Sequence, residues 1–578
     1  MTDLSTDHEQ AATRQPTNRL LTPLDALRAA VLDAAASLTA SDVAPGADGG
    51  EEASGKGTRG GITLERPRQA KFGDYSTNAA LLLAPGLGAP PRDVAQRLGE
   101  ALGERLGASL ERFEVAGPGF VNLFLADSWL TGALASALEA GEAYGAGGAA
   151  RPERVLVEFV SANPTGPMHV GHARNAAYGD ALARMLAFHG HSVEREFYVN
   201  DAGSQVRKLA ESIQALARGE RPAEDGYQGE YVGELATQLT DAASMDVDEL
   251  GRVAVAVMVG ELKRSLGAFG VEDFHTWTFE SSLHEGERSA IAHTLSLLEE
   301  QGHTYESDGA LWLRTTDFGD DKDRVLVRSS GEYTYFAPDI AYHQGKRERG
   351  FERQIDVWGA DHHGYVMRMK AAYAALGGNP DELELLIMQL VHLVRSGERA
   401  QMSKRSGEFV TLDDLVAEIG VDAARWFLLA RSHDTTVDLD LDLARQQSSE
   451  NPVYYVQYAH ARIASMLAKA GAERVAEAVA GVIDPEREGL HPTERHLIEQ
   501  LLAFPAELAE AVERRAPHRV AAYALELAQG FTAFYRDCHV VGAEPRSVES
   551  LRIALCVVSA STIARCLALL GVSAPEHM

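Results

Sequence analysis

The chain has 578 residues, of which 45% are apolar and 24% are charged, as in an ordinary globular protein. This length is too great for one hydrophobic core, so several domains are expected. The net charge of −30 excludes a protein that coats nucleic acid unspecifically, because such binding needs a basic face, and any contact with nucleic acid must use local basic patches.

Membrane and metal signals are absent from the sequence. Apolar runs such as 79–84 fall short of the about 20 residues that span a bilayer, and the polar N-terminus lacks a signal-peptide layout. We therefore expect a soluble, cytoplasmic protein with no membrane partner. The three cysteines, Cys538, Cys556 and Cys566, lack the paired spacing of zinc sites, so buried free thiols and no metal are expected.

The N-terminal part predicts a small α+β domain over residues 18–127, after a polar and flexible N-terminus at 1–17. Its signals, in chain order, are a helix at 23–38, a flexible Gly- and Ala-rich loop at 41–61, and strand and helix signals at 61–84 and 113–126.

A second domain is expected over residues 150–400. The run VLVEFV from Val155 predicts a buried parallel strand, and a turn and a helix at 170–188 follow, which is how an α/β unit begins. Further predicted elements are strands at 325–328 and 354–358, a helix at 367–376, and an insertion at about 205–300. Residues 401–451 predict a loop and connecting helices, and 452–578 predict an all-α domain.

The first chemical motif, ANPTGPMHVGH, lies where the helix after the first strand begins. It consists of Ala162, Asn163, Pro164, Thr165, Gly166, Pro167, Met168, His169, Val170, Gly171 and His172. Free N–H groups and the helix dipole favour phosphate at this place, so His169 and His172 would donate to phosphate oxygens. Gly171 would leave room for an adenine ring. Two histidines that only cap a helix are the alternative.

The second motif, AQMSKRSGEFVTLDDL, carries Met402, Ser403 and Lys404 on a loop before a helix that Thr411 and Asp414 can cap. The ammonium group of Lys404 would neutralise the charge that develops as pyrophosphate leaves ATP. A solvated loop is the alternative interpretation.

Together the two motifs resemble the HIGH and KMSKS signatures of class I aminoacyl-tRNA synthetases. They stand here as HVGH and QMSKR, so Gln401 replaces the first lysine and the role of that position is open. Longer runs resemble the arginyl branch over nearly the whole chain: LERPRQAKFGDYSTNAA, VAGPGFVNLFL, DFHTWTFESSL and YRDCHVVGAEPRSVESLRIAL. The resemblance implies a Rossmann-type α/β catalytic domain with a parallel sheet, an α+β N-terminal domain and an all-α C-terminal domain.

The same resemblance implies that ATP, accompanied by Mg²⁺, and L-arginine form arginyl-adenylate, and that arginine then passes to tRNA(Arg). It implies a monomer without a tightly bound cofactor, with His169, His172 and Lys404 as catalytic residues. The implied ATP contacts are Gly171, Gly359, Asp361, Met402, Ser403 and Lys404. For the segment WGADHHGYV, a metal site made by Asp361, His362 and His363 is the alternative.

The implied arginine contacts are Glu158, Ser161, Asn163, Glu280, Tyr335 and Asp339. A guanidinium group demands carboxylates in fixed geometry. By resemblance, Asp339 and Glu280 would supply them, and Tyr335 would add a hydrogen bond. Ser161 and Asn163 would hold the α-amino group, with Glu158 lining the site. For any single acidic residue, a surface charge is the alternative.

The two outer domains would bind tRNA. The N-terminal domain would recognise the tRNA elbow, with Tyr75 and Asn78 as candidates together with Phe72. The C-terminal domain would bind the anticodon through Tyr454, Tyr458 and Arg462, because aromatic and cationic side chains suit unstacked bases. Tyrosines buried in a core are the alternative.

Two other functions stay open. One is an adenylyl-transferring enzyme of the same superfamily that acts on a small thiol or amine. The other is a catalytically inactive relative that binds tRNA.

Overall fold

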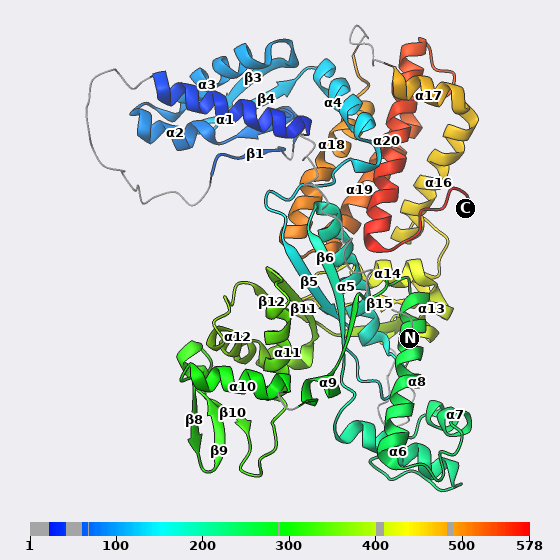
Figure 1. Ribbon diagram of the computed structural model, residues 1–578. Helices are drawn as coiled ribbons and strands as arrows, with labels where there is room; N and C mark the ends of the chain where they lie inside the picture. The colour runs from blue at the N-terminus through cyan, green and yellow to red at the C-terminus, as the bar shows by residue number, and fades with distance from the viewer. Residues whose placement is uncertain (1–21, 42–60, 68, 287–288, 400–409, 482–488) are drawn as a thin grey trace, which may run out of the picture.

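The computed structural model describes residues 22–41, 61–67, 69–286, 289–399, 410–481 and 489–578. Within them the chain forms an N-terminal α+β unit, a central α/β unit and a C-terminal helical unit (Figure 1). The fold class expected from the sequence is confirmed.

The N-terminal unit packs helices on a four-stranded antiparallel sheet of order β1-β2-β4-β3. Its elements are α1 (Pro23–Ser41), β1 (Leu64–Glu65), η1 (Ala70–Phe72), β2 (Tyr75–Thr77), α2 (Ala79–Leu87), α3 (Pro91–Leu106), η2 (Gly107–Ser109), β3 (Leu110–Ala116) and β4 (Phe120–Leu125). Leu27, Leu98 and Leu123 are buried between helices and sheet. Gly73 has a φ of 87°, and a Cβ there would lie 2.5 Å from the carbonyl oxygen of Leu123, so only glycine fits this turn.

The helix α4 (Asp127–Ala140) and the short η3 (Gly141–Ala143) lead into the α/β unit. Its sheet has five parallel strands in the order β12-β11-β5-β6-β7. These strands are β5 (Arg154–Phe159), β6 (Ser192–Val199), β7 (Thr276–Phe279), β11 (Arg353–Gly359) and β12 (Leu383–Met388). Val155, Val157 and Phe159 of the central strand β5 are fully buried, as a strand covered on both faces requires. The covering helices include α5 (Val170–His189), α11 (Phe336–Glu348) and α12 (Val366–Ala375).

Two insertions, not one, interrupt the sheet. The first, between β6 and β7, contains α6 (Ser204–Ala217), α7 (Glu230–Gln238) and α8 (Val247–Ala268). The second, between β7 and α11, contains α9 (Glu280–His284), α10 (Ala290–Glu300), β8 (Thr304–Ser307), β9 (Ala310–Leu313), η4 (Thr315–Phe318) and β10 (Arg324–Val327). The interval 205–300, predicted as one insertion, therefore contains a strand of the parallel sheet. The predicted strand at 325–328 lies in the separate antiparallel sheet β10-β9-β8.

A connecting region follows the sheet. It comprises β13 (Val391–Arg395), β14 (Glu398–Arg399), α13 (Leu412–Ile419), α14 (Val421–Leu429), β15 (Val437–Asp440) and α15 (Leu441–Ala444). Within the sheet, the short η5 (Ala360–Tyr365) leads from β11 into α12. The helical unit consists of α16 (Pro452–Ala470), α17 (Ala472–Ala480), α18 (Pro492–Glu513), α19 (Pro517–Asp537) and α20 (Arg546–Leu570). All three cysteines are buried and free, as predicted.

Helix α20 is the one helix in the described ranges that is long and apolar enough to cross a membrane, with a mean hydropathy of 2.1 over its most apolar 18 residues. The apolar runs singled out from the sequence did not include this stretch. In the protein 67% of it is buried, and the helix packs against α16, α17, α18, α19 and α5. This environment is typical of the central helix of a helical domain.

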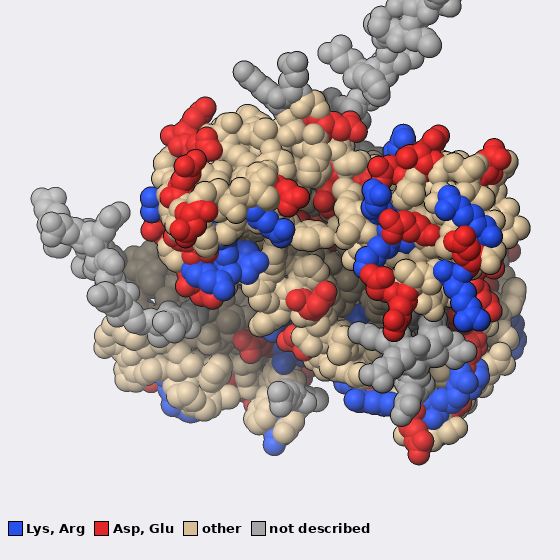
Figure 2. Space-filling model, turned by 90° about the horizontal axis from the view of Figure 1, so that it is seen from below, with Lys and Arg blue, Asp and Glu red and all other residues tan. Residues whose placement is uncertain are grey.

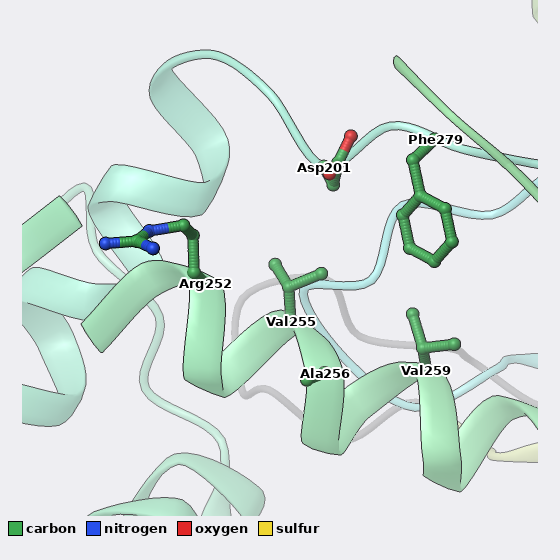
Figure 3. Close-up of a pocket in the computed structure, with 6 residues that line it drawn as sticks. All are labelled: Asp201, Arg252, Val255, Ala256, Val259 and Phe279. Carbon is green, nitrogen blue, oxygen red and sulfur yellow. The ribbon is translucent and has the colours of Figure 1, made fainter. Parts of the chain in front are cut away.

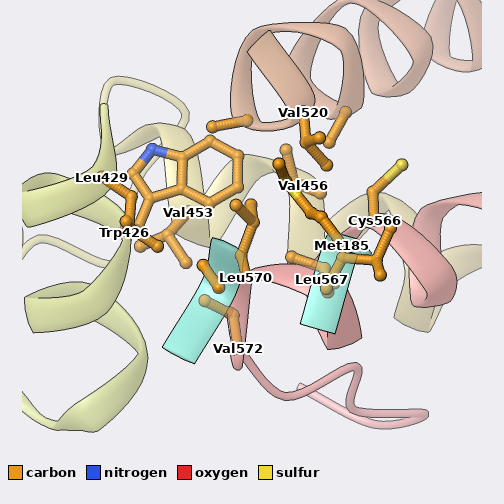
Figure 4. Close-up of a cluster of buried hydrophobic side chains, with 14 of the residues drawn as sticks. Met185, Trp426, Leu429, Val453, Val456, Val520, Cys566, Leu567, Leu570 and Val572 are labelled. Carbon is orange, nitrogen blue, oxygen red and sulfur yellow. The ribbon is translucent and has the colours of Figure 1, made fainter. Parts of the chain in front are cut away.

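One apolar core runs from the α/β unit into the helical unit. Figure 4 shows part of it, with Met185 from α5, Trp426 and Leu429 from α14, Val453 and Val456 from α16, Val520 from α19, and Cys566, Leu567 and Leu570 from α20. Helix α5 is thus covered by its own sheet and by the helical unit. Its first turn, which carries the HVGH motif, has a firmly packed helix behind it.

Candidate active site

A strained turn at the carboxyl end of β5 precedes the first motif. Val160 and Ser161 have φ angles of 70° and 42°, a left-handed conformation that costs non-glycine residues about 1–3 kcal/mol each. The Ser161 hydroxyl donates to Glu158 Oε1 at 2.7 Å and accepts from the Tyr198 N–H at 3.1 Å. Strands β5 and β6 therefore hold the turn in place.

Glu158 belongs to a buried charge network beneath this turn. Its second oxygen, Oε2, accepts from the ammonium group of Lys346, which also donates to Asp356 at 2.7 Å. His343 bridges Asp356 at 2.8 Å and the carbonyl oxygen of Asp339 at 2.7 Å. Each carboxylate oxygen of Glu158 already accepts one hydrogen bond, so this residue supports Ser161 and shares its charge with Lys346.

The histidines of the motif form a reciprocal cap at the start of α5. Nδ1 of His169 accepts from the Gly171 N–H at 3.0 Å, and Nδ1 of His172 accepts from the His169 N–H at 3.3 Å. The two rings stack with centroids 3.8 Å apart. Burial, with a smaller contribution from His169, lowers the pKa of His172 to about 3, so this imidazole is neutral at physiological pH. Since each Nδ1 is an acceptor, each neutral ring carries its proton on Nε2.

The structure gives a second reason for glycine at position 171, besides the expected room for adenine. A Cβ at this residue would lie 2.8 Å from Cε1 of His169, so a side chain would displace the imidazole. Asn163 is exposed and donates to Gln205 of α6 at 2.8 Å.

The chain that follows the second motif runs beside the first. The Leu412 N–H donates to the Met168 carbonyl at 2.8 Å, and the Val170 N–H donates to the Val410 carbonyl at 3.3 Å. Thr411 and Asp414 form the predicted cap of α13. Gln401, Met402, Ser403 and Lys404 lie outside the described residues.

At the end of β11, a Cβ on Gly359 would lie 2.6 Å from Asp361 Oδ1, so a larger residue would have to move this exposed carboxylate. The side chain of Asp361 is 82% exposed and stands 3.5 Å from His362 Nε2. Among the described residues, no three His, Cys, Asp or Glu side chains come together as a metal site, so the alternative at 361–363 gains no support.

Two carboxyl groups, the buried Glu280 and the half-buried Asp339, lie near each other beyond the carboxyl end of β7. Glu280, the first residue of α9, accepts from the Tyr198 hydroxyl at 3.1 Å, and Asp339, in the first turn of α11, accepts from the Tyr365 hydroxyl at 2.6 Å. Burial, together with the nearby Asp339, raises the pKa of Glu280 to about 7. Burial also raises the pKa of Asp339. Two desolvated acids this close together, one of which raises the pKa of the other, are an arrangement that would favour a bound cation.

Tyr335, expected to add a hydrogen bond to the guanidinium, stands at the start of α11. It makes no capping hydrogen bond and is 66% exposed, and the hydroxyl that donates to Asp339 belongs to Tyr365. Sequence reasoning missed both Tyr198 and Tyr365. Their only signal was position, since Tyr198 ends a strand and Tyr365 lies in the WGADHHGYV segment.

A cavity of about 320 Å³ opens beside the acids, between α8 and the ends of β6 and β7. Asp201, Arg252, Val255, Ala256, Val259 and Phe279 line it (Figure 3). Asp201 accepts from the N–H and the hydroxyl of Ser281 at 2.8 and 2.6 Å. The cavity is thus lined both by the first insertion and by the segment that leads to Glu280.

The residues of the N-terminal unit that were expected to contact tRNA differ in how exposed they are. Tyr75 is only 6% exposed and packs edge-on against Trp129, so the structure puts it in the core and not on a tRNA-facing surface. Asn78 is half-buried and accepts from the Thr63 N–H at 2.8 Å. Phe72 is 43% exposed.

The candidates of the helical unit come together on one face of α16. The rings of Tyr454 and Tyr458 stack with centroids 6.0 Å apart, and the Arg462 guanidinium lies 4.7 Å from the Tyr458 ring centroid. The same guanidinium lies 5.0 Å from the ring of Tyr535 on α19, a residue that sequence reasoning missed. This group forms an exposed aromatic and cationic surface, since Tyr458 and Tyr535 are 41% and 42% exposed.

The view in Figure 2 shows basic and acidic side chains interspersed over one face of the molecule. This agrees with local contacts to nucleic acid instead of one broad basic field.

Comparisons with known proteins cover all three units. The model of the class I (R) tRNA synthetase catalytic domain matches residues 133–228 and 240–464. The arginyl-tRNA synthetase N-terminal domain matches 28–125, and the DALR anticodon-binding domain matches 456–578.

Similar whole proteins include arginine–tRNA ligases. The one from Geobacillus thermodenitrificans is 47% identical over 89% of this chain and 94% of its own length, and the one from Bacillus subtilis is 45% identical over the same shares. The Thermus thermophilus arginyl-tRNA synthetase structure has a TM-score of 0.72 and 25% identity over 96% of this chain and 99% of its own.

A methionyl-tRNA synthetase from Mycobacterium tuberculosis, at a TM-score of 0.52 and 13% identity over 74% of this chain and 92% of its own, shares the fold alone. With a relative 47% identical over nearly its whole length, the chain belongs to the arginyl-tRNA synthetase family, the class I ligases that join arginine to tRNA.

Proposed function

We propose that the carboxyl edge of the parallel sheet binds arginine through the Glu280–Asp339 pair, activates it with ATP and transfers it to tRNA(Arg). The single observation that carries the assignment is the pair itself. Both acids are desolvated, and within the described chain neither makes a hydrogen bond to a lysine or arginine. A guanidinium group offers two edges of donors that satisfy two such carboxylates, whereas an ammonium group offers a single point charge.

The α-amino group of the substrate would lie at the other end of the pocket. Ser161, fixed by Glu158 and by the Tyr198 N–H, and the exposed Asn163 would receive it. Glu158 would act through Ser161, since Lys346 neutralises its charge.

ATP would lie between the starts of α5 and η5. The Nε2–H groups of His169 and His172 would donate to phosphate oxygens at the helix N-terminus. Further proposed ATP contacts are Gly171, Gly359, Asp361, Met402, Ser403 and Lys404. Mg²⁺ would arrive with the triphosphate as part of the substrate. Catalysis would come from positioning and charge stabilisation, because the attacking carboxylate belongs to arginine and no enzyme nucleophile is needed.

The tRNA would contact both outer units. Tyr454, Tyr458 and Arg462 would stack with unpaired anticodon bases. Asn78 and Phe72 stay as elbow candidates, while the burial of Tyr75 removes it. We propose a monomeric enzyme of the cytoplasm, where its tRNA is found.

The test is the kinetics of charging with arginine, lysine and citrulline for the wild type and Asp339→Asn. The wild type should prefer arginine over lysine by ~10⁴ or more, because lysine leaves carboxylate oxygens unpaired. Asp339→Asn should raise the KM for arginine about tenfold or more while the KM for ATP stays constant. The matched control is Asp308→Asn, in the exposed turn between β8 and β9. An unchanged arginine KM in Asp339→Asn would refute this pocket.

A further inference from the structure

Arg425 of α14 is fully buried, and its guanidinium joins four segments that are distant in the sequence. Nη2 donates to Asp180 of α5 at 2.5 Å, and Nε donates to the carbonyl of Leu570, the last residue of α20, at 2.9 Å. Nη1 donates to the carbonyl of Phe269, which follows the last turn of α8, at 3.3 Å. One side chain thereby connects α14, the HVGH helix, the first insertion and the helical unit.

These contacts match the chemistry of an arginine and no other side chain. The carboxyl ends of α8 and α20 carry partial negative charge and carbonyls without partners in their own helices. A rigid fork of donors can serve two carbonyls and a carboxylate at once, which a lysine ammonium on a flexible stem cannot. Gly571, which caps α20 with a φ of 67°, makes room for the fork, since a Cβ there would lie 2.3 Å from Cζ of Arg425.

Asp180 also has a second arginine partner, which links it to the chain after α8. Arg184 donates to Asp180 at 2.8 Å and to the Gly270 carbonyl at 3.1 Å, and its Nη1 stands 3.2 Å from Glu272. Asp180 is fully buried, so its carboxylate depends on these partners.

Helix α14 lies between the two motifs and the helical unit. On one side it packs against α13, whose first residue, Leu412, donates to the Met168 carbonyl of the first motif at 2.8 Å. On the other side Asp422 of α14 accepts from the Ser573 N–H at 2.9 Å and from Gln457 of α16 at 2.8 Å. Trp426 and Leu429 of α14 also share the apolar cluster in Figure 4 with residues of α5 and α20. A displacement of the helical unit therefore reaches α5 through α14.

We propose that Arg425 is a positioning residue for the ligation reaction. It holds the ends of α8 and α20 next to Asp180 of α5. In this way it couples tRNA binding by the helical unit to the placement of His169 and His172. Arg425 touches no substrate and acts only through α5. The inference rests on the proposed tRNA contact at Tyr458 and Arg462.

The test compares full-length wild type, Arg425→Lys and Gly571→Ala. Lysine keeps the charge beside Asp180 but cannot serve both carbonyls, and the methyl group of alanine pushes the guanidinium away from the side of α20. Both variants should lower the kcat for charging at least about tenfold, since small misplacements of catalytic groups have costs of this order. The dissociation constant for tRNA should stay within about threefold of the wild type, because a tenfold change would need about 1.4 kcal/mol of lost contact.

The matched control is Arg474→Lys, which makes the same change in the 2.9 Å ion pair with Glu549, a contact confined to the helical unit. Its kcat should stay at the wild-type value. All rates are measured per folded molecule, well below the unfolding midpoint of each variant.

The coupling is refuted if Arg425→Lys and Gly571→Ala charge tRNA with the same kcat as the wild type. It is also refuted if a smaller folded fraction fully explains their loss of activity. Tyr458→Ala separates this failure from that of the proposed function. If its tRNA affinity equals that of the wild type, the tRNA contact itself is refuted. If tRNA binding weakens in Tyr458→Ala while Arg425→Lys charges normally, only the coupling is refuted.

Discussion

The affinity for arginine should fall as the pH is lowered from 8 to 6, because Glu280 must be ionised to pair with a guanidinium group. Burial, with contributions from Asp339 and Asp201, raises the pKa of Glu280 to about 7 against the hydrogen bond from Tyr198, which lowers it. His284 is the remaining titratable neighbour, 4.0 Å from Oε1. Above the raised pKa the carboxylate is ready to bind, and below it arginine must displace a proton.

The size of the effect follows from the pKa. At pH 6, about one unit below its pKa, Glu280 is mostly protonated. Removing this proton to bind arginine costs about 1.4 kcal/mol, which raises the KM for arginine about tenfold. At pH 8 the group is mostly ionised and the penalty is near zero. The KM for arginine should therefore rise about tenfold between pH 8 and pH 6.

Steady-state charging kinetics at pH 6, 7 and 8 measure this dependence, with the KM for ATP recorded in parallel. Glu280→Gln should have a higher arginine KM throughout and a much flatter pH profile. Glu285→Gln changes an exposed neighbour at the end of α9 and should keep the wild-type slope. A flat wild-type profile, or an equal slope in Glu280→Gln, would contradict the assignment of Glu280 as a guanidinium ligand.

Three further outcomes are expected. Lys404→Ala should lower the charging rate by about 10²- to 10³-fold through loss of one electrostatic donor, with arginine binding in equilibrium dialysis unchanged; near-normal turnover would remove Lys404 from the mechanism. Tyr365→Phe should raise the arginine KM severalfold, because Asp339 loses its donor at 2.6 Å, and an unchanged KM would show that this support is dispensable. Arg495→Ala should lower the free energy of unfolding in denaturant by about 2 kcal/mol, since Asp74 in the N-terminal unit loses the guanidinium 2.8 Å away on α18; a loss near zero would refute this role for the pair.

Local signals in the sequence sufficed for the elements that carry the motifs. The apolar run at β5 and the helix spacing after it predicted the strand and α5 nearly to the residue, because both are long and regular. Strand β7 has only four residues and could not be separated from the helices around it, so the two insertions looked like one.

Pairings over long sequence distances could not be predicted in the same way. Tyr365 and Asp339 are 26 positions apart, and Tyr198 and Glu280 are 82 apart, so only the fold brings each hydroxyl to its acid. Tyr75 shows the opposite error. Its neighbours are polar, yet β2 pairs with strands on both sides and turns this ring into the core. A strand of three residues is too short for alternation to reveal its inward face.

The burial of α20 has a consequence for how the protein is made. Domains generally fold in the order of their synthesis, yet one side of α5 is covered by α20, a helix that is translated long after it. Until residues 546–570 have left the ribosome, the apolar groove formed by α5, α16 and α19 has no occupant from its own chain. A prematurely released polypeptide would expose this groove to chaperones and proteases and would lack the support of its HVGH helix. Catalytic competence thus requires that α20 has been synthesised and has packed against the helix that carries the first motif.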